Sequence, residues 1–91
     1  GEQSRDFTHV NDIVRANLLA IQSDMPREID ICTGKNTSMN EVAKYFNCEV
    51  KHVADRPGDA KHLIQDPVPA KSLLGFTTEI PFDFNSIKVY L

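Results

Sequence analysis

Two arginines that lie far apart in the chain each occur in a short motif of the kind that binds anions. The first motif is RDFTHV at residues 5–10, and the second is RPGD at residues 56–59. The guanidinium group of arginine is planar and always charged, and its fixed N–H donors match two phosphate oxygens at once. Arg5 and Arg56 together therefore predict the two halves of a grip on a diphosphate.

The second motif has a backbone suited to hold its arginine in place. Pro57 fixes its own backbone and favours an extended conformation at Arg56, while Gly58 permits a tight reversal. Asp59 could then accept hydrogen bonds from a ribose hydroxyl or a base amide. For the tetrapeptide alone, the alternative is an exposed turn with a weak Arg56–Asp59 ion pair.

The first motif precedes the clearest predicted helix, which begins near Val10. The backbone N–H groups in the first turn of a helix lack partners within the helix, and the helix dipole also favours anions there. An anion held by Arg5 would thus lie close to a second favourable site. Without that context, the alternative is a surface ion pair between Arg5 and Asp6 near a frayed terminus.

The remaining reactive residues predict neither a metal site nor a catalytic set. His9, His52 and His62 are not spaced with each other, or with Cys32 and Cys48, as zinc ligands are. His9 is expected to cap or pack at a helix entry, because no nucleophile or partner carboxylate is identifiable beside it. No metal and no catalytic residue are therefore expected in this chain.

The chain also lacks the sequence features of dinucleotide binding. Its four glycines, at positions 1, 34, 58 and 75, cannot form the Gly-x-Gly-x-x-Gly loop that follows a strand in dinucleotide-binding folds. Tyr45 does not belong to a Tyr-x-x-x-Lys pair, since Glu49 occupies the fourth position after it. No cofactor is expected in the chain itself.

Hydrophobic periodicity predicts the helices and short strands that carry these motifs. Apolar residues recur with helical spacing in the helices, and charged and apolar residues alternate in the strands. The segment Asp24-Met25-Pro26 is expected to end the first helix. In chain order, the predicted elements are helix 10–22, strand 28–32, helix 38–47, strands 49–53 and 61–65, helix 67–74 and a terminal helix at 82–91.

Capping signals support the ends of these helices. Ser38 or Thr37 is expected to cap the second helix, with Glu41 three residues after Ser38 as in a capping box. Asp66 is an N-cap candidate for the third helix, and Gly75 suits its C-terminal end. The expected fold class is α+β, or a fragment of an α/β enzyme, with about four helices and a small mixed sheet.

Length and composition indicate one globular domain spanning residues 1–91, with 41% hydrophobic and 25% charged residues. The net charge is −3 and the basic residues are dispersed, which argues against nucleic-acid or membrane-surface binding. No apolar run approaches the roughly 18–20 residues of a membrane span. Two cysteines without a disulfide pattern favour a reducing compartment, so the cytoplasm is expected.

With these residues in view, the chain resembles the C-terminal portion of an extended short-chain dehydrogenase/reductase of the nucleotide-sugar epimerase and dehydratase group. The resemblance covers nearly the whole chain, and its motifs occur in the family's order. They are the segments 1–12, 31–34, 38–43, 56–59 and 70–76, together with Asp66. Each motif is weak alone, but their order and compatible gaps make the series specific.

The resemblance implies roles for three residues. Arg5 and Arg56 would contact the diphosphate of a nucleotide sugar, and Asp59 would lie near the nucleoside. The family's NAD loop and its catalytic tyrosine, lysine and serine or threonine belong to an N-terminal Rossmann domain that would precede Gly1. Asp30 and Cys32 stand where the family commonly has Asn and Gly, which leaves the sugar preference open.

The leading interpretation is a substrate-binding C-terminal part of an NAD-dependent nucleotide-sugar epimerase or dehydratase, inactive alone, that grips a UDP- or dTDP-sugar. A decarboxylase of the same group remains open. The alternative is a freestanding α+β interaction or structural module that kept the fold without the ligand. In the family this region lies between two lobes, so we expect self-association, association with a Rossmann domain, or a compact variant fold.

Overall fold

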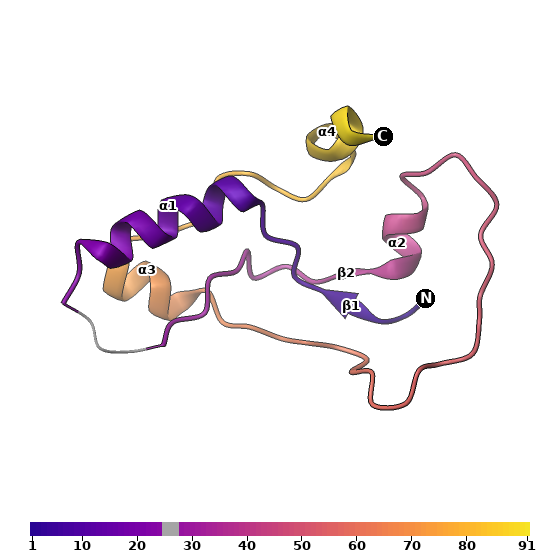
Figure 1. Cartoon of the computed structure of the whole chain (residues 1–91), viewed down its shortest axis with the longest axis horizontal. Coiled ribbons are helices and arrows are strands. Elements are labelled where there is room, and N and C mark those ends of the chain that lie inside the picture. Colours follow the sequence, from indigo (N-terminus) through magenta and orange to yellow (C-terminus); the bar gives the residue numbers. More distant parts are fainter. Residues whose placement is uncertain (25–27) are drawn as a thin grey trace.

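The computed structural model describes residues 1–24 and 28–91, and its shape is flat and open (Figure 1). Its principal extents are 48 × 32 × 16 Å, and its radius of gyration is 15.6 Å. A compact domain of this length would have a radius of gyration of about 12 Å. The expectation of a compact variant fold is therefore wrong.

Within residues 1–24 and 28–91, the regular structure consists of four helices, one 3-10 turn and a two-stranded sheet. The strands pair antiparallel, with Ser4 opposite Ser38 and Arg5 opposite Thr37. The number of helices agrees with the prediction, whereas the sheet is antiparallel rather than mixed. In chain order the elements are β1 (Ser4–Arg5), α1 (Val10–Ile21), β2 (Thr37–Ser38), α2 (Met39–Ala43), α3 (Val68–Leu74), α4 (Phe84–Ile87) and the 3-10 turn η1 (Lys88–Tyr90).

The first two helices begin where their capping residues predict. The backbone N–H of Asn11 donates to Nδ1 of His9 at 3.0 Å, so His9 caps α1 as expected. Ser38 caps α2 by accepting from the backbone N–H of Glu41 at 3.1 Å. Helix α2 is shorter than predicted because the chain continues past residue 43 in tighter turns, such as the one closed by the Tyr45 N–H.

Helix α1 ends at Ile21, one residue before the predicted end. Met25 and Pro26, which were expected to end it, lie outside the described residues. Gly75 closes α3 at the predicted end, with a φ of +64°. Asp66 accepts from the Val68 N–H at 3.0 Å, but α3 begins at Val68 rather than at residue 67. Helix α4 covers only Phe84–Ile87 of the predicted terminal helix 82–91. Asp83 and Ser86 form a reciprocal capping box at the start of α4.

The predicted strands at 28–32, 49–53 and 61–65 are wrong. Segment 28–32 keeps the predicted alternation, since Ile29 and Ile31 pack against the core, but no described segment forms a ladder with it. The other two segments lie on a long exposed stretch, and their one bridge pairs His62 with Ser4 in parallel. Alternation of apolar and charged residues indicates which side of a segment is buried. A strand also needs hydrogen bonds to the backbone of a neighbouring segment.

The core lies where α1 and α3 pack together, and it is small. Ala16, Ala70 and Phe76 are buried there, and the Arg15 guanidinium lies 4.5 Å from the centre of the Phe76 ring. The C-terminal segment is held separately, since the rings of Phe7 and Phe82 stack 4.3 Å apart. No helix in the described parts of the chain is long and apolar enough to cross a membrane.

Asp12, in the first turn of α1, is a buried charge that fixes the segment after α3. Its carboxylate accepts hydrogen bonds from the backbone N–H groups of Glu79 and Ile80, both at 3.1 Å, and from Arg15 at 3.3 Å. Burial by itself would raise the pKa of Asp12, but these hydrogen bonds outweigh it and lower the pKa below its ordinary value.

Removing this charge should therefore change both stability and its pH dependence. A carboxyl group whose pKa is lowered by folding adds stability above its unfolded pKa and loses that stability as pH falls through its folded pKa. Asp12→Asn should lower the free energy of unfolding by about 2–4 kcal/mol at neutral pH. It should also flatten the loss of stability on acidification, measured by urea unfolding between neutral and acidic pH.

Asp30→Asn is the matched control, because Asp30 is an exposed carboxylate on a neighbouring segment. It should leave both the stability and its acid dependence close to those of the unchanged chain. Equal pH dependence in the chain and in Asp12→Asn would contradict the role given to Asp12.

Candidate functional site

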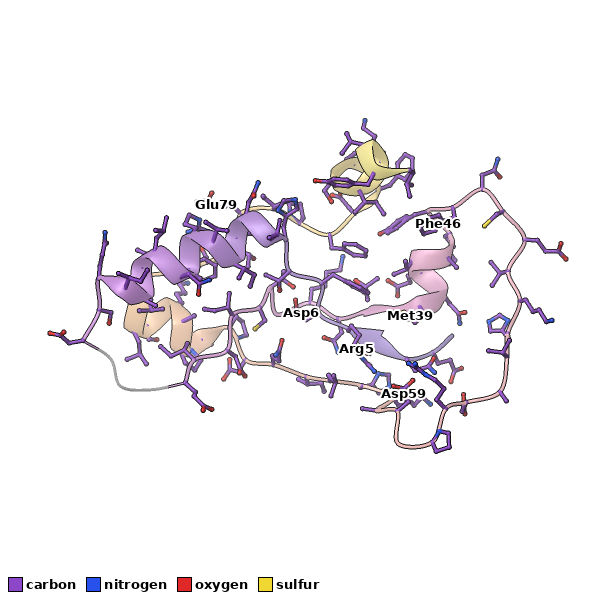
Figure 2. All side chains as sticks on the ribbon, in the orientation of Figure 1. Arg5, Asp6, Met39, Phe46, Asp59 and Glu79 are labelled. Atoms are coloured by element: carbon purple, nitrogen blue, oxygen red, sulfur yellow. The ribbon has the colours of Figure 1, made fainter. Side chains whose placement is uncertain are left out.

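The short strand β1 brings the two arginine motifs together by binding the chain just after the second one. The backbone N–H of Ser4 donates to the carbonyl oxygen of Lys61 at 2.8 Å. The Ser4 hydroxyl and Nδ1 of His62 form a second hydrogen bond of 2.6 Å. Arg5, the next residue of β1, therefore lies beside the turn at 56–59 (Figure 2).

The Arg5 guanidinium is half-buried and held mainly by backbone carbonyls. Nη1 donates to the carbonyl oxygen of Ser4 at 2.7 Å, and Nη2 donates to that of Ala60 at 2.8 Å. Nη2 also lies 3.7 Å from Oδ1 of Asp59, and the two side chains are 28% and 30% exposed. These contacts give the Arg5 side chain a defined orientation before any ligand contact.

The turn at 56–59 forms as the sequence predicts, although the flanking strands do not. The Asp59 N–H donates to the Arg56 carbonyl oxygen at 3.3 Å, and Gly58 has a φ of +80°, which favours glycine. The Arg56 side chain is 84% exposed, and its Nη2 lies 3.5 Å from Oδ2 of Asp59. The Asp59 carboxylate thus faces both guanidinium groups, one at each oxygen.

These three side chains line an open hollow of about 880 Å³. This volume is within the range of small-molecule sites, roughly 300–1,000 Å³. The charged lining residues of the hollow are four basic ones, Arg5, Lys51, Arg56 and Lys61, and three acidic ones, Glu2, Asp55 and Asp59. Lys61 is paired with Glu2 at 3.3 Å. Part of the wall is apolar, formed by α2 and the exposed segment that follows it, and includes Met39, Ala43, Val50, Val53 and Ala54. The hollow therefore suits a ligand with both anionic and apolar parts.

The start of α1 does not line this hollow, so the hollow gives no support to the expectation that Arg5 and the α1 N-terminus act on one anion. No residue of α1 belongs to the described lining. His9 accepts from one N–H of the first turn, and Asp12 directs its carboxylate toward residues 79 and 80. Arg5 and the first turn of α1 are close in sequence but contact different segments. Arg5 contacts residues 59 and 60, whereas Asp12 in the first turn contacts residues 79 and 80.

Asp6 holds the turn at residues 33 and 34, a role that the sequence interpretation missed. Its carboxylate accepts hydrogen bonds from the Thr33 N–H at 3.0 Å, the Thr33 hydroxyl at 2.7 Å and the Gly34 N–H at 2.8 Å. The alternative of an Arg5–Asp6 ion pair is therefore wrong. The available signal was the Thr-Gly turn, whose adjacent backbone N–H groups form a concavity for an anion.

The polar clusters that the structure describes contain no group of three His, Cys, Asp or Glu side chains placed to hold a metal ion. His52 instead pairs with Oδ1 of Asn40 at 3.1 Å, and His62 with Ser4. Cys32 is buried and Cys48 is exposed. Burial, followed by the nearby charge of Asp6, raises the pKa of the Cys32 thiol, which keeps it protonated.

Comparison with known proteins relates the chain to one enzyme family. Residues 1–32 match the NAD dependent epimerase/dehydratase family. A putative UDP-glucose 4-epimerase of Methanocaldococcus jannaschii is 37% identical over 87 residues, which are 88% of this chain and 28% of that protein. The similarity in sequence thus covers most of this chain and a minor share of its relative.

Solved structures extend the similarity to the fold. The UDP-glucose 4-epimerase of Thermotoga maritima, solved with UDP-glucose, is 32% identical with a TM-score of 0.89, covering 98% of this chain and 30% of that chain. MoeE5, solved with UDP-glucuronic acid and NAD, is 30% identical with a TM-score of 0.79, covering 100% of this chain and 35% of that one. The chain therefore spans about a third or less of each relative.

The contacts of Asp6 predict a local effect on the turn that it holds. Asp6→Ala leaves two backbone N–H groups and a hydroxyl without their acceptor, so the free energy of unfolding should fall by about 1.5–3 kcal/mol. Amide hydrogen exchange at Thr33 and Gly34 should quicken more than at α1, as measured by NMR. Unchanged exchange at these two amides would contradict the role of Asp6, and Asp30→Ala serves as the control.

Proposed function

We propose that the chain, which is similar to part of UDP-glucose 4-epimerases, is the C-terminal, substrate-binding part of an NAD-dependent epimerase/dehydratase. The observation that carries this proposal is the meeting of Arg5, Arg56 and Asp59 at one hollow. The ligand would be a UDP- or dTDP-sugar, in keeping with the UDP-sugars bound by the relatives.

The chemistry of the hollow suits the parts of such a ligand. A diphosphate carries adjacent oxygens with negative charge, which two guanidinium groups can bind with charge-assisted hydrogen bonds. Asp59 is placed next to the arginines, where its carboxylate can accept a hydrogen bond from a ribose hydroxyl. The apolar wall near Val50 and Val53 offers a surface for the flat nucleobase.

We assign no NAD contact to this chain. NAD is bound in the MoeE5 structure. Here, however, Gly34, Gly58 and Gly75 adopt positive φ in three separate turns, and the Gly34 N–H is already bound by Asp6. They do not form the continuous loop that cradles a dinucleotide. In this proposal, NAD and the catalytic tyrosine, lysine and serine or threonine belong to residues outside this chain, and the chain alone is inactive.

A second candidate function, an interaction module, is favoured by the outer face of α1. Val10, Val14, Leu18 and Ile21 recur with helical spacing on this face, and each is between 52% and 80% exposed. A contiguous apolar stripe is unusual on a monomer and is typical of a contact surface. Whether or not the hollow binds a nucleotide sugar, this stripe can associate with another copy or with a Rossmann domain.

The proposed ligand grip predicts which variants lose binding. Arg56→Ala should weaken UDP-glucose binding by about ten- to a hundredfold, because a charge-assisted contact contributes about 1.5–3 kcal/mol. Arg5→Lys should also weaken it, since lysine keeps the charge but lacks the planar donor pair. Dissociation constants would be measured by NMR titration of the chain, with a dTDP-sugar as the second ligand.

Lys71→Ala removes the same charge from α3, outside the hollow, and should leave binding unchanged. Equal affinity of the chain and Arg56→Ala for UDP-glucose would overturn the proposed grip.

The stripe on α1 makes a separate prediction about assembly. The chain should self-associate as its concentration rises, and the double variant Val14→Lys, Leu18→Lys should remain monomeric because lysines resist burial in an apolar contact. Sedimentation velocity would measure both, with Ile64→Lys, on an exposed segment away from α1, as the control. Self-association that persists in the double variant would exclude this face as the contact.

A further inference from the structure

The Asp59 carboxylate lies between the guanidinium groups of Arg5 and Arg56. Oδ1 lies 3.7 Å from Nη2 of Arg5, and Oδ2 lies 3.5 Å from Nη2 of Arg56. Both of its oxygens are thus directed at guanidinium groups from segments far apart in the sequence. A diphosphate bound between the two guanidinium groups would compete with this carboxylate for Nη2 of each arginine.

The contacts of Asp59 are weak enough for such an exchange. The two separations are long for charge-assisted hydrogen bonds, which are about 2.7–2.9 Å. The Arg56 side chain is 84% exposed and that of Asp59 is 30% exposed, so solvent screens their attraction and the pair is weak. Asp59 can leave the guanidinium groups at a small cost.

Loss of the contact with Asp59 would affect the two arginines differently. Arg5 is anchored by the carbonyl oxygens of Ser4 and Ala60, and these contacts do not involve Asp59. Arg56 has its contact with Asp59, three residues later in the same turn, and its side chain otherwise projects into solvent. Departure of Asp59 therefore leaves Arg5 in place and releases Arg56 to close on the ligand.

We propose that Asp59 is an exchangeable internal counter-ion that makes the hollow selective for nucleoside diphosphates over simple anions. This inference rests on the proposed function and concerns the same site. A bare pyrophosphate held between the two arginines would displace Asp59 from these contacts and offers the carboxylate no new partner. A nucleoside diphosphate displaces it too, but its ribose hydroxyl can donate a hydrogen bond to the displaced carboxylate, which offsets the loss.

The test compares the unchanged chain with Asp59→Asn in their affinities for inorganic pyrophosphate and for UDP. All titrations use one fixed ionic strength, because salt screens the attraction between the arginines and both ligands. NMR titration that follows the arginine Nε–H signals measures millimolar affinities and reports on Arg56 directly. Asp59→Asn should bind pyrophosphate about three- to tenfold more tightly, which corresponds to two weak ion pairs lost. Its preference for UDP over pyrophosphate should fall by at least the same factor.

Asp55→Asn is the matched control, because Asp55 lines the same hollow and carries the same charge but pairs with neither arginine among the ion pairs described. It should produce less than half of the gain in pyrophosphate affinity. An equal gain in both variants would show a general effect of charge and overturn the counter-ion role.

The outcomes separate this inference from the proposed function. If Arg56→Ala weakens UDP binding while Asp59→Asn leaves pyrophosphate affinity unchanged, the counter-ion role is wrong and the grip stands. If no ligand binds the chain or any variant, or if Arg56→Ala has no effect on UDP, the proposed function itself is wrong and the inference is overturned with it.

Discussion

The extended segment from Gln3 to Asp6 is the structural element on which the rest of the chain depends, because it joins three distant regions. Its Gln3 carbonyl accepts from the backbone N–H of Met39 at 2.8 Å, at the start of α2. Its Ser4 N–H binds the Lys61 carbonyl on the other side. Asp6 then holds the turn at residues 33 and 34. The hollow exists because these contacts place α2 and the turn at 56–59 on either side of Arg5.

The stability of the chain rests on a small apolar core and on hydrogen bonds of a few buried polar side chains. Few side chains are buried, and Asp12 and Thr37 are among them. Buried polar groups of this kind contribute specificity when every hydrogen bond is satisfied and are costly when one is missing. The apolar outer face of α1 and the unpaired segment 28–32 remain open, which fits a chain that spans about a third or less of its relatives.

The sequence was most informative where the determining contacts are local. Helix α1, the Ser38 cap, the Gly75 end of α3 and the reversal at Gly58 follow from residues a few positions apart. The strands failed because alternation identifies a buried side but not a partner, and the partner of β1 lies more than thirty positions away.

For the candidate site too, the sequence indicated the local features but not the long-range contacts. The types and setting of Arg5, Arg56 and Asp59 could be recognised from their motifs, and the resemblance placed them in one site. Their mutual geometry depends on the pairing of Ser4 with residues 61 and 62, which no local pattern encodes. The same holds for Asp6, whose partner turn is twenty-seven and twenty-eight positions away. The sequence thus indicated which residue types form the candidate site, but not the distances between their side chains.

We propose that Arg5 on β1 and Arg56 on the turn at 56–59 form one grip on the diphosphate of a nucleotide sugar. A crystal structure of the chain grown with UDP would test this grip. We expect diphosphate oxygens within hydrogen-bonding distance of both the Arg5 and Arg56 guanidinium groups, with the base on the apolar side of the hollow. A diphosphate bound elsewhere, for example at the start of α1, or contacted by neither arginine, would contradict it.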